Sequence, residues 1–195
     1  LLAGEIRSAF CMTEPAVGTD VLALKTTARR DGDVFRLSGT KTFITNGGVS
    51  DTELGDCFIV YAATAPKTIS SFLVEKGMPG FALGQQWKDK LGMRASFTAE
   101  LVFDEVPVPL ANQIGADGEG TIHMMRNLEI ERLTLAAMSL GIAQRSLQVM
   151  VDYANERKAF GKAIREFGQI QRHVAESFAE WRSARTFVYD VARRL

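Results

Sequence analysis

The segment Val106-Pro-Val-Pro-Leu-Ala-Asn-Gln-Ile-Gly115-Ala-Asp-Gly118-Glu-Gly120 marks the place where the hydrophobic pattern of this 195-residue chain changes. Its prolines and glycines are typical of turns and connections. Before the segment the apolar residues form short strand-like runs, and after it they recur at helical spacing. The sequence therefore predicts a β domain over residues 1–112 and a helical domain over residues 113–195, an α+β fold.

The first domain contains short runs rich in Val, Ile, Phe and Thr that are separated by Gly, Pro or Asp. This composition is typical of strands in an antiparallel sheet or barrel. The runs are Val34–Ser38, Lys41–Thr45, Cys57–Ala62, Ile69–Val74 and Phe97–Phe103. We therefore expect an antiparallel β-barrel or sandwich.

The second domain carries two long helical patterns. In the first, Leu128, Leu135, Ile142 and Val149 recur every seven residues. A second pattern starts near Phe167 and places apolar residues three, four or seven positions apart. Its members are Ile170, Val174, Trp181, Val188, Val191 and Leu195. Two helices cannot bury two apolar faces by pairing only with each other, so we expect long antiparallel helices of an incomplete four-helix bundle.

The composition excludes several classes of protein. Lys plus Arg and Asp plus Glu both total 23, and this balance argues against nucleic acid or an anionic membrane as the main partner. Neither Cys11 nor Cys57 belongs to a CxxC pair, and neither His123 nor His173 has metal-site spacing, so no metal site is expected. No apolar run is long enough to span a bilayer. The chain lacks an initiator methionine and stops within a helical pattern, as expected for a truncated product.

The stretch Arg126-Asn-Leu-Glu-Ile-Glu131-Arg132 holds two glutamates with opposite surroundings. On a helix Glu129 lies three positions from both arginines, so it has cationic neighbours. Glu131 has only apolar or weakly polar neighbours at helical spacing, which is expected to raise its pKa toward that of a base near neutral pH. The alternative is that Glu131 simply reaches solvent.

Two segments of the β domain have the composition of a ring-binding site. The loop Phe10-Cys-Met-Thr-Glu-Pro-Ala-Val-Gly-Thr-Asp20 offers backbone amides and the hydroxyls of Thr13 and Thr19, with Phe10 and Met12 beside them. The strand end Lys41-Thr-Phe-Ile-Thr-Asn-Gly47 places Phe43 and Thr45 on one face. The alternatives are an ordinary loop and a core Phe beside a surface Thr.

The connector Arg157-Lys-Ala-Phe-Gly-Lys162 combines cations, an aromatic ring and a glycine. Arginine can grip diphosphate oxygens in a forked geometry, and Phe160 can pack on a planar base such as adenine. A solvated connector is the alternative. No GxGxxG or P-loop is present, so Rossmann and hydrolase interpretations are weak.

Six motifs, taken in order, resemble the flavin-dependent acyl-CoA dehydrogenases. They are Thr13–Asp20, Phe43–Gly47, Phe72–Phe81, Lys90–Arg94, Val106–Pro109 and Glu156–Gly161. The likeness covers nearly the whole chain, and its specificity lies in the order of separate motifs. Within the family, Leu128-Glu-Ile-Glu-Arg-Leu133 looks most like the isovaleryl-CoA branch.

The resemblance implies a role for each candidate site residue. It makes Glu131 the catalytic base, and it places Phe10, Met12, Thr13, Phe43, Ile44 and Thr45 around the flavin ring of FAD. It implies that Thr19, Glu129 and Arg132 lie at the acyl-CoA, and that Arg157 and Phe160 hold the ADP part of FAD, in a neighbouring subunit. Three residues depart from the family pattern: Phe43 replaces a tryptophan, Gly168 a glutamine and Ile122 a tyrosine.

The implied function is α,β-dehydrogenation of a short or branched-chain acyl-CoA such as isovaleryl-CoA, as in leucine catabolism. The implied partner is an electron-transferring flavoprotein, and the implied assembly is a homotetramer in the mitochondrial matrix or bacterial cytoplasm. The family's N-terminal helical domain and last helices have no counterpart in these residues. The alternatives are an acyl-CoA oxidase on the same scaffold and a non-catalytic assembly or binding module.

Overall fold

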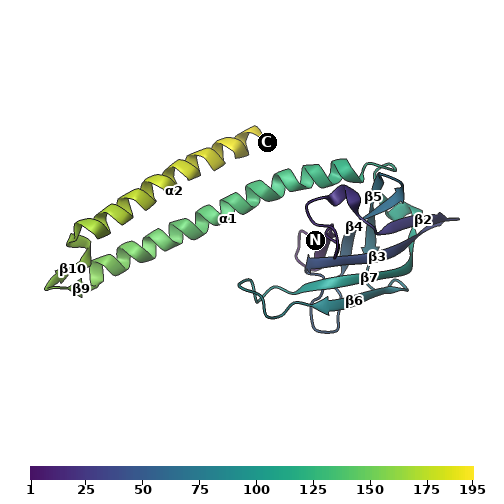
Figure 1. The fold of residues 1–195 in the computed structure, drawn as a ribbon, viewed down its shortest axis with the longest axis horizontal. Helices are drawn as coiled ribbons and strands as arrows, with labels where there is room; N and C mark the ends of the chain where they lie inside the picture. Colours follow the sequence, from purple (N-terminus) through teal and green to yellow (C-terminus); the bar gives the residue numbers. More distant parts are fainter. The chain divides into compact units, whose positions relative to one another are not determined.

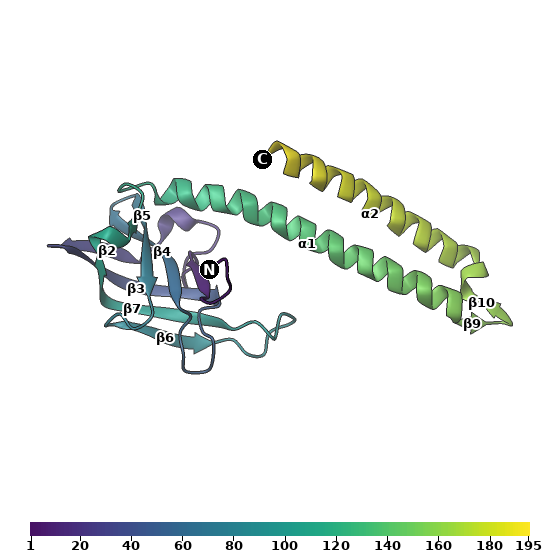
Figure 2. The same cartoon turned by 180° about the vertical axis from the view of Figure 1, so that it is seen from behind.

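The computed structural model describes all residues from Leu1 to Leu195 and forms two compact units, Leu1–Met124 and Met125–Leu195. The first unit contains the large sheet, and the second contains a pair of long helices (Figures 1 and 2). The mixed α+β class predicted from the sequence is confirmed.

The sheet of the first unit has eight strands. They are β1 Ser8–Cys11, β2 Thr27–Asp31, β3 Val34–Thr45, β4 Cys57–Ala65, β5 Thr68–Glu75, β6 Phe81–Gln86, β7 Thr98–Pro109 and β8 Gln113–Ile114. The strand order is β6-β7-β3-β2-β4-β5-β8, with β1 beside β4. Most neighbours are antiparallel as expected, but β4 pairs in parallel with both β1 and β2.

Of the two expected forms, barrel or sandwich, a closed barrel is not formed, because the two terminal strands of the sheet, β6 and β8, do not pair. The sheet nevertheless curls around its core, since the rings of Phe58 in β4 and Phe81 in β6 lie 4.9 Å apart although the strands are not neighbours. The strand β8 is only two residues long and pairs with β5 alone. An edge this short cannot complete a ring of hydrogen bonds around a barrel.

The two predicted runs at residues 34–38 and 41–45 form the single strand β3. Its pairing with β7 shifts register between Leu37 and Gly39 and again between Lys41 and Ile44. Gly39 therefore sits at a bulge rather than at a strand end. A Cβ at this glycine would lie 2.6 Å from Oγ1 of Thr26, the residue just before β2, so this close approach requires a residue without a side chain.

The Val106–Pro109 segment, which marked the change of pattern in the sequence, is the end of strand β7 rather than a connection. Val106 and Val108 are fully buried, while Pro107 and Pro109 alternate with them. Along this stretch β7 pairs with β3 only, since its pairing with β6 extends no further than Phe103. Proline is tolerated where a strand has a free edge, because no ladder hydrogen bond is lost there.

Both predicted helices are present, as α1 Gly120–Glu156 and α2 Gly168–Arg194. A short hairpin of β9 Lys158–Ala159 and β10 Lys162–Ala163 joins them. The remaining elements are the 3₁₀ turns η1 Val21–Ala23, η2 Leu110–Asn112 and η3 Ile164–Glu166. Neither helix combines the length and apolar character needed to cross a membrane.

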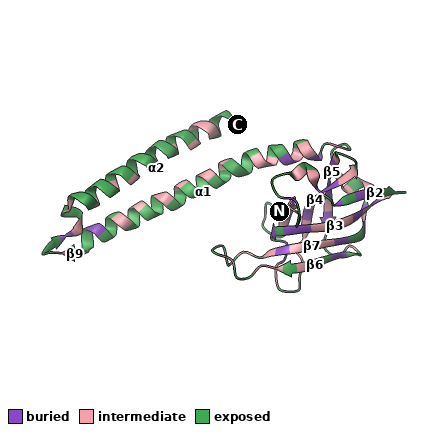
Figure 3. Cartoon of the chain, in the orientation of Figure 1, coloured by how far each residue is buried: buried purple, intermediate pink, exposed green.

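The face of α1 that meets α2 differs from the stripe identified in the sequence. The side chains of Leu135, Ile142 and Val149 are exposed. Leu128, the first member of that stripe, is half-buried. From residue 133 onward the half-buried and buried positions of α1 form another stripe at three- and four-residue spacing, namely Leu133, Ala136, Leu140, Ala143, Leu147, Met150 and Ala154. In Figure 3 exposed residues dominate both helices, so α1 carries an apolar stripe that α2 does not cover.

Candidate functional site

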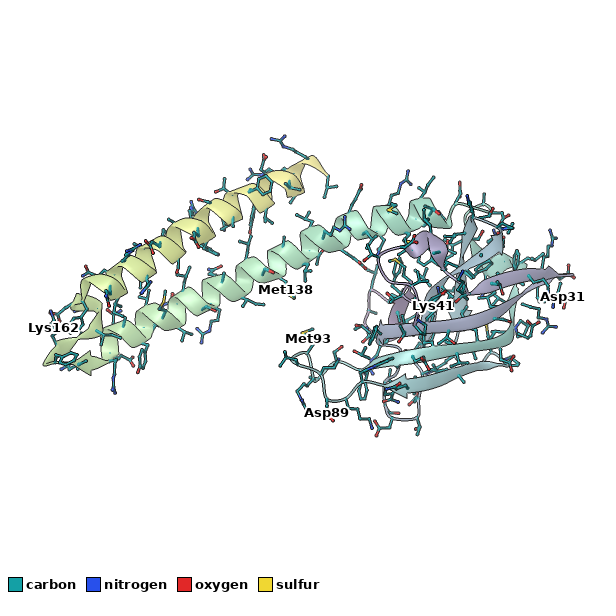
Figure 4. The ribbon with its side chains drawn as sticks, in the orientation of Figure 1. Asp31, Lys41, Asp89, Met93, Met138 and Lys162 are labelled. Atoms are coloured by element: carbon teal, nitrogen blue, oxygen red, sulfur yellow. The ribbon has the colours of Figure 1, made fainter.

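A buried ion pair lies beneath the Phe10–Asp20 loop in the first unit. Lys41 of β3 is 0% exposed and Glu14 is 5% exposed. Lys41 Nζ donates to Glu14 Oε1 at 2.9 Å and to the carbonyl oxygen of Met12 at 3.1 Å. Figure 4 places Lys41 among the strands of the sheet. The loop is thus attached to β3 through a charged group that water does not reach.

The same glutamate also holds the returning end of the loop. Glu14 Oε1 accepts hydrogen bonds from Thr26 N at 3.0 Å and Thr26 Oγ1 at 2.6 Å, and Oε2 accepts one from Lys25 N at 2.6 Å. Burial raises the pKa of Glu14, but the hydrogen bond and charge of Lys41, together with these donors, outweigh burial and hold the pKa below its usual range. Burial has the larger influence on Lys41 and lowers its pKa, against the opposing effect of Glu14.

The loop itself begins with a tight turn. Glu14 N donates to Val17 O at 2.9 Å and Val17 N to Glu14 O at 3.1 Å, which leaves Pro15 and Ala16 as the two turn residues. Thr42 N donates to Thr13 O at 2.9 Å, so two consecutive residues of β3 hold the loop. The candidates Phe10, Met12 and Thr13 are half-buried and Thr19 is exposed.

The end of β3 presents the predicted aromatic and hydroxyl pair. Phe43 and Thr45 are both exposed, and Ile44 between them is buried in the core. Phe43 has a positive φ of 57° at the bulge, and its ring centroid lies 4.6 Å from that of Trp87. The side chain of Ile44 is therefore closed to a ligand, which leaves only its backbone for the predicted cofactor contact.

The helix residues of the second unit are arranged differently from the sequence-based expectation. Glu131 is exposed, and its Oε1 accepts a hydrogen bond of 2.8 Å from Asn127 Nδ2. The predicted pairing of Glu129 with Arg126 and Arg132 is wrong, because α1 contains no ion pair at these residues. All three side chains are exposed, and such pairs contribute little energy in water.

Glu129 and Arg132 instead line one open groove between the two helices. Its volume is about 360 Å³ and its other lining residues include Phe187, Val188 and Val191 of α2. Glu131 is not part of this groove. The two substrate candidates are therefore brought together on one face, while the proposed base lies on another.

The connector between the helices is the β9–β10 hairpin, and the candidate aromatic residue is at its tip. Phe160 and Gly161 are its two turn residues, with φ values of 50° and 79°. Phe160 is 96% exposed, and Arg157 is also exposed. Arg157 holds the hairpin through its backbone, since its carbonyl oxygen accepts a 2.8 Å bond from Ile164 N. Its guanidinium therefore remains available for an anion.

Comparison with known protein families assigns both parts of the chain. Residues 9–106 match the middle domain of acyl-CoA dehydrogenases, and residues 118–195 match the C-terminal domain. The chain belongs to the acyl-CoA dehydrogenase family. The resemblance inferred from the six sequence motifs is confirmed.

Individual relatives of this acyl-CoA dehydrogenase chain differ in the acyl group that their names specify. It is 42% identical to the mitochondrial isovaleryl-CoA dehydrogenase of Oryza sativa subsp. japonica, covering 99% of this chain and 47% of the relative. The structure of butyryl-CoA dehydrogenase from Megasphaera elsdenii matches with a TM-score of 0.91 at 38% identity, over 97% of this chain and 49% of that one. A glutaryl-CoA dehydrogenase from Mycobacterium smegmatis in complex with FADH2 matches with a TM-score of 0.89 at 33% identity, over 98% and 47%. The chain thus spans about half the length of these relatives.

Sequence reasoning missed the two buried charges of this family member, Glu14 and Lys41. Lys41 inside a run of strand-forming residues was a usable signal for a buried ion pair. Lysine is almost never buried without a partner, so a lysine in a core strand indicates that an acidic partner lies beside it. Its partner lies 27 positions away in the chain, and no local spacing identifies it.

Sequence reasoning also missed a contact of His123. Its Nδ1 lies 2.8 Å from Ser71 Oγ, and its Nε2 lies 3.9 Å from Glu119 Oε2. Ser71 is 1% exposed and also donates to the carbonyl oxygen of Ile114. A hydroxyl so enclosed cannot reach a substrate, so these residues fasten the start of α1 to β5.

Proposed function

We propose that this chain is the central part of an acyl-CoA dehydrogenase that acts on a short or branched-chain acyl-CoA thioester. Glu131 removes the proton from the carbon next to the thioester carbonyl. Bound FAD would supply the acceptor for the hydride of the adjacent carbon. The single observation that carries the proposal is the attachment of the Phe10–Asp20 loop to the end of β3, which gathers ring-binding groups in one unit of a chain whose family membership is established.

The groups at this attachment fit a flavin ring. Phe43 and Thr45 are exposed on the end of β3, and Thr13 is half-buried in the loop held against that strand. A flat heteroaromatic ring can stack on Phe43 while hydroxyls and backbone amides bond its polar edge. Trp87 supports the stack, because its ring lies against Phe43. The indole of Trp87 adds aromatic surface beside Phe43, the position at which the family usually has tryptophan.

The hairpin between the helices fits the ADP end of the same cofactor. The exposed ring of Phe160 offers a surface for adenine, and the free guanidinium of Arg157 can form paired bonds with phosphate oxygens. We propose that this hairpin serves the cofactor of a neighbouring copy in a homotetramer. Gly168 offers no side-chain amide at the start of α2, so one side-chain contact usual in the family is absent from this site.

Glu131 is the proposed base, and its carboxylate is exposed on α1. Asn127 donates to one carboxylate oxygen, leaving the other oxygen free, and no cation is paired with the group. The α-carbon of a thioester is a weak acid, so proton removal also requires hydrogen-bond donors at the carbonyl oxygen and exclusion of water around the carboxylate. Arg132, next in sequence, is proposed to contact the CoA side of the substrate together with Glu129 and Thr19.

The acyl group is proposed to be isovaleryl or a similar short chain. This choice rests on the Leu128–Leu133 motif and on the 42% identity with the rice isovaleryl-CoA dehydrogenase. Ile122 replaces the tyrosine usual in that branch. The electron acceptor is proposed to be an electron-transferring flavoprotein, in a mitochondrial matrix or bacterial cytoplasm.

The first experiment is an anaerobic titration of the purified chain with FAD and then with isovaleryl-CoA, followed by visible absorption. Flavin bands that are retained after gel filtration and bleach with the thioester would support the proposal. Absence of bound flavin after gel filtration would contradict the proposal for the isolated chain. Rapid formation of hydrogen peroxide in air by the reduced protein would instead indicate an acyl-CoA oxidase.

The role of Glu131 is tested by Glu131→Gln in a chimera in which this chain replaces the matching half of the rice relative. We expect FAD to remain bound and the rate of flavin reduction by isovaleryl-CoA to fall by about 10²- to 10⁴-fold, as expected for loss of a general base. The matched control is Glu129→Gln, which removes a carboxylate two positions away on the same helix and is expected to weaken substrate binding more than the rate. Near-normal reduction of Glu131→Gln would exclude the assigned role.

A further inference from the structure

We propose that Glu14 and Lys41 are a positioning pair that holds the Phe10–Asp20 loop in the geometry required for the flavin ring, an inference that rests on the proposed function. Neither residue touches the ligand in this proposal. Their role is to fix the loop and the end of β3 relative to each other.

Several segments of the chain meet at this pair. Lys41 Nζ bonds to Glu14 and to the Met12 carbonyl, and Glu14 bonds to Lys25 and Thr26. These contacts tie three separate stretches of chain at one point: the entrance to the loop, its exit, and strand β3. All of the contacts are short, and the pair is shielded from solvent.

The pair lies close in the chain to the candidate ring-binding groups. Thr13 lies between Met12 and Glu14, the two loop residues that Lys41 holds. Phe43 and Thr45 lie two and four residues beyond Lys41 on the same strand. A single buried cation therefore sets the spacing between the loop hydroxyl and the aromatic and hydroxyl groups of the strand.

The charges of Glu14 and Lys41 are explained better by positioning than by stability. A buried ion pair is weak evidence for stability, because apolar residues of similar volume often serve a core equally well. Its hydrogen bonds are directional, however, and here every bond ends on the loop or at its base. The geometry accordingly points to positioning as the reason for burying two charges at this place.

The test compares Lys41→Met, Glu14→Gln and the double variant with the unaltered chain. Each protein is examined for amide hydrogen exchange over residues 12–26 and for FAD affinity by visible titration. Val74→Ala is the matched control, since it opens a cavity at a fully buried position of β5 and removes none of the hydrogen bonds of Glu14 or Lys41.

Both single variants are expected to accelerate exchange in the loop at least tenfold and to weaken FAD binding at least tenfold. The double variant is the decisive one. It removes the unpaired buried charge that each single variant leaves, so its melting temperature recovers toward that of the unaltered chain. Its FAD affinity stays low, because the bonds from Lys41 to Met12 and Glu14 are absent. The Val74→Ala control is expected to lose stability without a change in amide hydrogen exchange over residues 12–26.

Two results would overturn the inference. One is recovery of FAD affinity together with stability in the double variant, which is the behaviour of a purely structural pair. The other is unchanged exchange over residues 12–26 in Lys41→Met. Failure of the unaltered chain to bind FAD would count against the proposed function itself, and the exchange measurement would still decide whether the pair positions the loop.

Discussion

Glu14 shows how a single buried carboxylate depends on its donors. Four hydrogen bonds, from Lys41, Lys25 N, Thr26 N and Thr26 Oγ1, all stabilise its charged form. Because these donors outweigh burial, the pKa of Glu14 is lower in the folded chain than its ordinary value. The carboxylate therefore contributes to stability whenever it is charged.

This lowered pKa predicts a specific acid sensitivity. The contribution of Glu14 is fully present above its ordinary pKa of about 4.3, and it is lost as the pH falls through the lower folded value. We expect the free energy of unfolding of the first unit to drop steeply below about pH 4.3. Urea unfolding followed by circular dichroism between pH 3 and 7 measures this slope.

The matched variant for this prediction is Glu14→Gln, which keeps the shape of the side chain and removes its titration. It is expected to be less stable at pH 7, because Lys41 is left as an unpaired buried cation beside the thiol of Cys11. Its stability is also expected to change less between pH 3 and 4.3, as a group that cannot titrate contributes no slope. Identical slopes in the two proteins would show that other carboxylates control acid unfolding.

Glu131 illustrates the limit of reasoning from neighbours along a helix. The sequence correctly identified Asn127 as a polar neighbour, and the structure shows the bond between them. Desolvation of the carboxylate was inferred from the apolar neighbours at helical spacing, yet Glu131 is exposed. Side chains of the same helix cannot enclose a group that projects away from its axis, so burial at this position requires another element.

The β9–β10 hairpin is an element in which local strain and proposed function oppose each other. Its turn needs positive φ at both central positions, which favours Asn-Gly rather than Phe160-Gly161. Phe160 is almost fully exposed, so its edge contact with Phe167 at 6.1 Å contributes little. An aromatic residue in this conformation is explained if its ring serves a ligand.

We therefore predict opposite effects of Phe160→Asn on stability and on cofactor binding. The variant is expected to stabilise the helical unit by about 1 kcal/mol, since asparagine tolerates this backbone conformation better. FAD affinity of the assembled protein is expected to fall, because adenine loses its surface. Thermal unfolding and flavin titration provide the two readouts.

Gly161→Ala is the control for this prediction. It introduces a Cβ at the other positive φ of the turn and is expected to destabilise the hairpin by about 1 kcal/mol while leaving the Phe160 ring in place. A Phe160→Asn protein that is less stable than the unaltered chain would show that the ring has a packing role instead.

At the scale of the whole molecule, the two units differ in how much apolar surface they bury. The first unit has a continuous core that includes Phe58, Phe72 and Leu101, all fully buried. In the second unit only Ala154 and Ala163 are buried, although Trp181 Nε1 donates to the carbonyl oxygen of Leu140 at 3.2 Å between the helices. The stability of the chain is therefore concentrated in the sheet.

This difference predicts uneven protection from hydrogen exchange in the isolated chain. Amides of β3, β4, β5 and β7 are expected to exchange slowest, and those of α2 fastest among the regular elements, because few buried contacts oppose opening of the helix pair. Exchange measured by mass spectrometry at neutral pH would show this order. Equal protection of α2 and the sheet would mean that another copy of the chain covers the helices.

Residue type and spacing alone determined the α+β class, the positions of the two helices and the family, because these depend on local periodicity and on the order of short motifs. Alternation along a strand also predicted that Phe43 and Thr45 share a face, and both side chains are exposed, although the positive φ of Phe43 at the bulge interrupts the regular alternation. Tertiary structure alone decided that the sheet stays open, that β3 is one bulged strand, and which stripe of α1 meets α2. It also decided that Glu14 and Lys41 form a buried pair. Each of these features depends on contacts between residues that are far apart in the chain, and local sequence patterns do not predict such contacts.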